Sequence, residues 1–149
     1  MTKETPCKAF LIDPELQCIT QVEYSGDYKN IYEHIKADTF DCARFNADGD
    51  GVFVDDNGLL NGPEHFFVVE GYAQPLAGRG LVLGVNDDGE SVAPHVTLEW
   101  LQAHVAFVHC IGQGAIAVVV APGTMAGRVM QMFGGRIRAL HRAGCHRRG

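Results

Sequence analysis

The amino-acid sequence predicts an α+β fold: a mostly antiparallel sheet packed by one or two helices, followed by a basic C-terminal extension. Three observations support it. The chain has 149 residues of which 46% are hydrophobic, the size of one domain with material for a sizeable core. Short apolar runs alternate with turn residues, as in strands and hairpins. Two segments instead carry apolar residues at helical spacing.

The first strands form a predicted hairpin. Residues 8–12 are an apolar run that ends at Asp13-Pro14, and Ile19, Val22 and Tyr24 then resume an extended pattern. Proline after aspartate suits a turn, so we expect the two runs to pair antiparallel.

The first helix is predicted from residue 28 to residue 35. Ser25 or Asp27 stands where a helix cap is expected. Four residues at i, i+3, i+4 and i+7 form one apolar stripe: Tyr28, Ile31, Tyr32 and Ile35. We expect this helix to lie across the sheet.

The remaining elements are mostly short strands. Residues 40–45 and 51–54 form a predicted meander to which Leu59 and Leu60 pair back, and residues 66–69 and 81–85 are two further apolar strands. Thr97 is the expected cap of a second helix over residues 98–104, and a final strand follows it. The connection 71–80 holds three glycines and a proline, which is typical of loops that carry binding groups.

Charge divides the chain. All 18 acidic residues lie at or before Glu99, whereas the last 50 residues contain six arginines and no acid. We therefore predict an acidic α+β domain over residues 1–109 and a basic Gly/Arg-rich extension over residues 110–149. Such a tail covers the acidic domain of its own chain, contacts nucleic acid, or is an extension without selected function.

Composition also bears on location. The N-terminus lacks the apolar stretch of a secretory signal, and the longest apolar tract, residues 115–121, is far shorter than a membrane span. Five cysteines, an odd number without a CxxC pair, are typical of reduced thiols. We expect a cytoplasmic protein without disulfides or a transmembrane helix.

Two patterns suggest metals but fit poorly. Asn46, Asp48, Asp50 and Gly51 match the start of a calcium-binding EF-hand loop, yet Asn57 stands where a bidentate glutamate is required. We interpret this run, like the acidic pairs Asp55-Asp56 and Asp87-Asp88, as solvated turns. A zinc set would draw on residues without diagnostic spacing: His109, Cys110, His141, Cys145 and His146. We expect no metal and no cofactor.

No catalytic constellation is recognisable. Ser25 and Ser91 are the only serines, neither lies in a GxSxG motif, and Cys42 falls within a predicted strand as core filler. The sequence therefore favours a protein that is not an enzyme.

Several runs carry a family resemblance: residues 9–14, 28–35, 48–60 and, most specifically, Gly71 to Gly84. Over residues 8–109 the chain resembles a small family of domains of unknown function, whose members occur in bacteriophages, prophages and plasmids. The resemblance implies a mobile-element setting and brings no established activity or catalytic residue.

Two functional hypotheses follow. The first is an accessory binding protein that acts on a host protein or a small ligand, with Tyr72, Gln74 and Arg79 of the glycine-rich loop as ligand-binding residues. The alternative is nucleic-acid binding through the tail. Its contact residues would be four arginines: Arg128, Arg136, Arg138 and Arg142.

Overall fold

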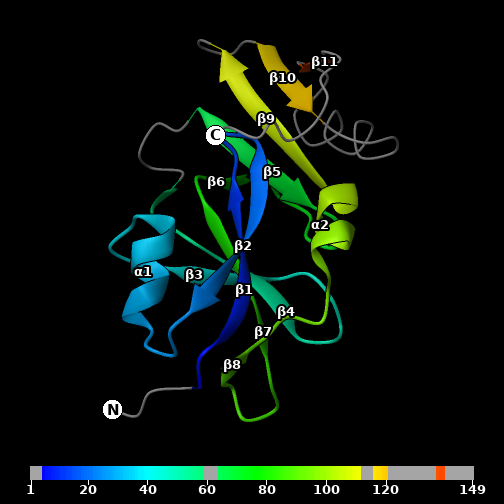
Figure 1. The fold of residues 1–149 in the computed structure, drawn as a ribbon. Coiled ribbons are helices and arrows are strands. Elements are labelled where there is room, and N and C mark those ends of the chain that lie inside the picture. The colour runs from blue at the N-terminus through cyan, green and yellow to red at the C-terminus, as the bar shows by residue number, and fades with distance from the viewer. Residues whose placement is uncertain (1–4, 59–63, 112–115, 121–136, 140–149) are drawn as a thin grey trace.

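The structure is a computed structural model, and it describes residues 5–58, 64–111, 116–120 and 137–139. These residues form two short helices, α1 (Lys29–Ile35) and α2 (Leu98–His104), and strands in two sheets (Figure 1). The strands are β1 (Cys7–Asp13), β2 (Cys18–Tyr24), β3 (Asp41–Arg44), β4 (Asp50–Val54), β5 (His65–Val69), β6 (Leu76–Ala77), β7 (Gly80–Val85), β8 (Ser91–Val92), β9 (Val105–Ile111), β10 (Ile116–Val120) and β11 (Ile137–Ala139).

Sheet A holds the first part of the chain in the order β2-β1-β7-β4-β3, and β8 pairs with β7. Every pairing in it is antiparallel. The predicted hairpin is confirmed, since β1 and β2 pair from Cys7 opposite Tyr24 to Asp13 opposite Cys18. The β3–β4 pair of the predicted meander is confirmed as well. Leu59 and Leu60, expected to pair back, lie outside the described residues.

Sheet B follows the order β11-β10-β9-β5-β6. Its pairings are antiparallel except for that of β10 with β11, which is parallel. The apolar strands β5 and β7, which follow one another in the sequence apart from the short β6, therefore belong to different sheets. The mostly antiparallel α+β class is confirmed. The predicted domain boundary after residue 109 falls inside β9, so the division into two parts stays a prediction.

One face of sheet A packs against sheet B and α2; we call it the closed face. Period-two alternation sends Phe10, Ile12 and Val52 to this side, where they meet Phe67 of β5 and Leu101 of α2. All five side chains are at most 1% exposed. The closed face is therefore the main core of the protein.

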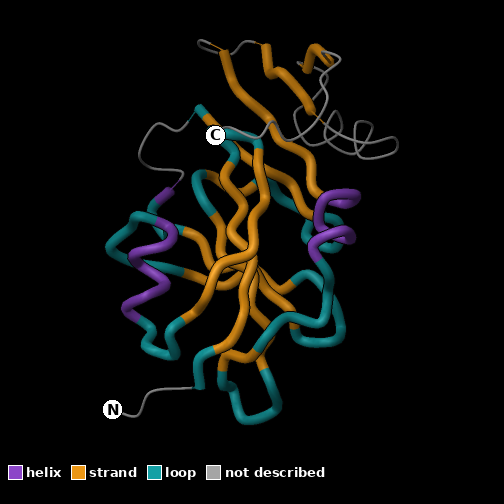
Figure 2. The backbone as a smooth tube through the Cα atoms, in the orientation of Figure 1, coloured by secondary structure: helices purple, strands orange, loops and turns teal. Residues whose placement is uncertain are grey.

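The opposite face of sheet A, which we call the α1 face, is covered by α1. The alternate residues Phe53, Leu81 and Leu83 point to this side and pack against Ile31 and Ile35 of the helix. Figure 2 shows the central strands between the two helices. The seven residues of α1 span only about 10 Å at 1.5 Å per residue. Such a short helix leaves part of this face uncovered.

The helix starts agree with the local sequence. The Thr97 hydroxyl accepts a hydrogen bond from the Trp100 N–H at 3.0 Å, which confirms the predicted cap of α2. Helix α1 begins one residue later than predicted, and the Asp27 carboxylate accepts from the Lys29 N–H at 3.1 Å. Neither α1 nor α2 is long and apolar enough to cross a membrane.

Cys18 corrects one expectation. It is disulfide-bonded in the structure, so the prediction of reduced thiols throughout the chain is wrong. The odd number of cysteines said nothing about which of them the fold brings together.

Candidate functional site

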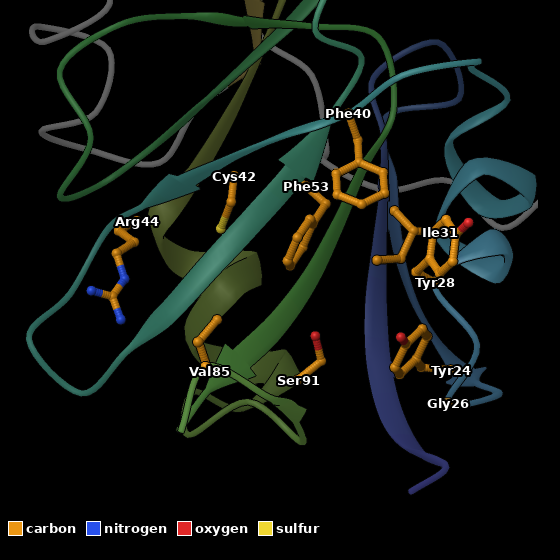
Figure 3. A pocket seen from close by; sticks show the side chains of 11 residues that line it. Tyr24, Gly26, Tyr28, Ile31, Phe40, Cys42, Arg44, Phe53, Val85 and Ser91 are labelled. Atoms are coloured by element: carbon orange, nitrogen blue, oxygen red, sulfur yellow. The ribbon is translucent and has the colours of Figure 1, made fainter. Parts of the chain in front are cut away.

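A pocket of about 520 Å³ opens on the α1 face of sheet A. Figure 3 shows aromatic and aliphatic side chains from α1 and its flanks at one end and Arg44 at the other. The lining residues come from α1, five strands and the segments beside them: Tyr24, Gly26, Tyr28, Ile31, Phe40, Cys42, Arg44, Phe53, Val85, Gly89 and Ser91. Its surface is mainly apolar, with a few polar groups at defined places. This is the usual composition of a small-molecule site.

Aromatic rings build the wall of the pocket that lies nearest α1. The Tyr32 and Phe40 ring centroids are 5.1 Å apart, and those of Phe40 and Phe53 are 5.4 Å apart at an interplanar angle of 81°. Tyr28 meets Tyr32 edge to face at 5.9 Å and is 44% exposed. Tyr32 does not line the pocket itself, but its contacts hold the rings of Tyr28 and Phe40 beside that of Phe53 in the wall.

Strand β3, with Phe40 just before it, lines the pocket from the end near α1 to the end at Arg44. Phe40, Cys42 and Arg44 occupy alternate positions and so point to the same side of the sheet. The Cys42 thiol is half-buried; burial raises its pKa, with Asp41 adding to the rise and Arg44 opposing it. Gly51 on β4 leaves the room for it, because a Cβ there would lie 2.5 Å from Cys42 Sγ.

Arg44 brings a positive charge to the pocket. Its side chain is exposed, and it forms no ion pair with any carboxylate in the described part of the chain. Its guanidinium carries donors in a planar fork that matches carboxylate and phosphate groups. This end of the pocket therefore favours an anion.

The run resembling an EF-hand loop has a different role. Asp50, predicted to be a solvated turn residue, is fully buried, so that prediction is wrong. Its carboxylate accepts from the His95 and Val96 N–H groups at 2.9 and 3.0 Å and from the Asn46 amide at 3.1 Å, and His95 Nδ1 lies 3.2 Å away. Burial alone raises the pKa of Asp50, but these hydrogen bonds outweigh it and the net pKa is lowered. Asp50 thus anchors the segment before α2 to β4.

The structure separates the three residues predicted to bind a ligand. Tyr72 and Gln74 line a small cavity of about 130 Å³ beside β3, β4 and β6. Arg79 lies elsewhere, with its guanidinium 3.3 Å from the Asp13 carboxylate and donating to the His34 carbonyl at 3.3 Å. The three residues therefore do not form one site, and their role in ligand binding stays a prediction.

Two glycines of the Gly71 to Gly84 run, Gly80 and Gly84, are required by packing. A Cβ at Gly80 would lie 2.5 Å from Val52 Cγ1 and 2.6 Å from Phe67 Cζ, where the two sheets meet. A Cβ at Gly84 would lie 2.9 Å from the Ala93 carbonyl oxygen and 3.2 Å from the Asp50 carboxylate. Both positions permit a close approach that a side chain would prevent. These two glycines of the run thus serve the fold.

Most of the tail arginines lie outside the residues that the structure describes. Arg138 falls in β11, whereas Arg128, Arg136 and Arg142 lie outside the described residues, as do His141, Cys145 and His146 of the zinc pattern. Nucleic-acid binding by the tail stays a prediction.

The sequence carries a local signal for the pocket. The helical stripe already grouped Tyr28 with Ile31, and the alternation along residues 40–44 placed Phe40, Cys42 and Arg44 on one face. What the sequence did not predict was the pairing of β7 with both β4 and β1, which joins the β3–β4 pair to the β1–β2 hairpin in one sheet.

Comparison with known proteins gives the family and nothing further. Residues 7–105 match the family described as Domain of unknown function (DUF3846). No curated protein and no solved structure matches the chain. The matched range covers α1, α2 and all of sheet A, including every residue that lines the pocket. The chain therefore belongs to the DUF3846 family of domains of unknown function.

Proposed function

We propose that this protein is a small-molecule-binding domain, and that its ligand occupies the pocket between α1 and sheet A. The observation that supports this is the pocket itself. Its volume of about 520 Å³ is within the size range of ligand sites, aromatic rings line its wall, and the positively charged Arg44 stands at one end. A binding role rather than catalysis agrees with the hydrogen bonds that Asp50 makes to the protein, since Asp50 is the one fully buried carboxylate among the residues whose burial is described.

The lining defines the class of ligand. Phe40 and Phe53 offer ring edges and faces to a planar apolar body, and Arg44 offers a guanidinium to an acidic group. The ligand we propose is a small aromatic or otherwise planar acid, with its apolar part toward α1 and its carboxylate or phosphate toward Arg44.

The biological setting belongs to the same proposal and rests on the family resemblance. In it the protein is a cytoplasmic accessory protein of a bacteriophage, prophage or plasmid, and occupancy of the pocket affects its action on a host target. The ligand-binding step is the part that the pocket supports.

The test compares two probes that differ only in charge. Ligand-observed NMR titrations measure the affinity of naphthoate and of its neutral analogue naphthamide for the wild-type protein. We expect naphthoate to bind roughly tenfold more tightly, because a hydrogen bond to a charged group contributes about 1.5–3 kcal/mol. In Arg44→Gln this preference should disappear while naphthamide binding stays the same.

Lys29→Gln is the matched control. It removes one positive charge from the exposed side of α1, outside the pocket lining, so the preference for naphthoate should persist. A preference that survives in Arg44→Gln would place the anion elsewhere on the molecule and contradict the proposal. Failure of both probes to bind the wild-type protein would also contradict it.

A further inference from the structure

Two histidines meet in sheet B, outside the lining of the α1 pocket. His65 opens β5 and lies directly opposite His109 of β9 in sheet B. Their Nδ1 atoms are 3.2 Å apart, and their ring centroids are 4.5 Å apart at an angle of 32°. Both residues are half-buried. The antiparallel register, which places the two Cα positions opposite one another, thus brings two good metal ligands together.

A carboxylate completes the cluster. Glu64 immediately precedes His65, and one ligand atom from each of Glu64, His65 and His109 lies within 4.8 Å of the others. In the described part of the chain this is the one such group of three. Two histidines and one carboxylate are a ligand set that zinc accepts with three protein donors and one open position.

The spacing of the two nitrogens suits a metal. Zn–N bonds of about 2.0–2.1 Å in tetrahedral geometry put the two nitrogens roughly 3.3 Å apart. The observed 3.2 Å is close to that value before any rearrangement. Without a metal, one Nδ1 must carry a proton and donate to the other. With a metal, both lone pairs are used.

The neighbouring cavity favours a cation. A cavity of about 220 Å³ borders Glu64 and His65, and its lining holds three carboxylates, those of Asp13, Glu15 and Glu64, against the single guanidinium of Arg79. Arg79 already lies 3.3 Å from Asp13, so part of its charge is balanced. A cation bound at the cluster would sit beside net negative charge.

We propose that Glu64, His65 and His109 form a zinc-binding site that links β5 to β9. The fourth position is open to water or to a donor atom that enters from the cavity. Of the residues in the zinc pattern of the sequence, the proposed site uses His109 but not Cys110 or the tail histidines. The proposal differs from our expectation that the chain binds no metal. It is independent of the ligand proposed for the α1 pocket.

The test uses Co²⁺ and Zn²⁺ with the full-length, untagged protein. Co²⁺ reports its coordination number through its visible absorption, and Zn²⁺ competes with it for the same site. We expect one Co²⁺ per chain with the intense spectrum of a four- or five-coordinate ion, displaced by one equivalent of Zn²⁺. His65→Ala and His109→Ala should each weaken binding by at least about tenfold, the lower bound seen even for residues that only support ligands.

Further variants separate the site from other histidines. Glu64→Gln changes an exposed residue, so it should keep the fold while weakening the metal and altering the Co²⁺ spectrum. His34→Ala on α1 and the double variant His141→Ala/His146→Ala should bind as the wild type does. No stoichiometric binding by the wild type would overturn the proposal. Binding that disappears only in the double tail variant, or that persists in both His65→Ala and His109→Ala, would overturn it too.

Discussion

The two faces of sheet A are built from the same alternating strands but are covered differently. On the closed face, sheet B and α2 bury Phe10, Ile12 and Val52 almost completely. On the α1 face, a helix of seven residues covers Leu81 and Leu83 and leaves a pocket of about 520 Å³ beside them. One face is thus packed almost completely, whereas the other keeps an open pocket.

Truncating one ring on each face gives the largest expected effect. Phe67→Ala removes a fully buried ring where the sheets meet and should lower the free energy of unfolding by about 3–5 kcal/mol. Phe40→Ala removes a half-buried ring from the pocket wall and should cost less than about 2 kcal/mol. Urea denaturation of both variants measures the difference. Equal losses would show that the α1 face is packed as tightly as the closed face.

Asp50→Asn tests the polar anchor between β4 and the segment before α2. The amide keeps the shape but loses the charge and turns one acceptor into a donor that faces the His95 and Val96 N–H groups. We expect a loss of about 1–3 kcal/mol in the free energy of unfolding. His95→Ala is the matched control and should cost clearly less, because the backbone N–H donors remain. Equal losses in the free energy of unfolding would show that Asp50 acts mainly through the His95 imidazole rather than through the backbone N–H groups.

The same carboxylate gives stability a pH dependence. Since the hydrogen bonds lower the pKa of Asp50 in the folded state, its contribution is present above the unfolded value of about 3.9 and is lost as the pH falls toward the folded-state pKa. The free energy of unfolding should be measured as the pH is lowered from 6 to about 3. It should fall less steeply with pH in Asp50→Asn than in the wild type. Parallel curves for the two proteins would contradict this.

The smallest expected effect concerns Cys42 in the pocket. Burial raises its pKa, so less thiolate is present at neutral pH and alkylation by iodoacetamide should be slower than that of a small-molecule thiol. Peptide mapping by mass spectrometry follows the modification at this residue, and Cys42→Ser identifies its peptide. Naphthoate should slow the reaction further. If bound naphthoate leaves the rate at Cys42 unchanged, the probe does not occupy the α1 pocket.

Local patterns predicted the elements but not what the elements pack against. The β1–β2 hairpin, α2 and the Thr97 cap follow from residues within one turn or one strand, so the sequence predicts them well. The continuous apolar runs of β5 and β7 show that both strands are buried, but not that they belong to different sheets. The burial of Asp50 depends on His95 and Val96, which are far along the chain, and the separation of Arg79 from Tyr72 and Gln74 depends on where the β1–β2 turn places Asp13. Contacts of this range leave no local signature.

The close approach at Gly84 has an evolutionary consequence. The missing side chain at this position is the space that the Asp50 carboxylate and the Ala93 carbonyl occupy. An ancestor that exchanged the glycine for a larger residue would displace the acid, and one that lost the acid would remove a reason to keep the glycine. The two positions are therefore expected to be inherited as a pair, and aligned relatives should keep or replace them together.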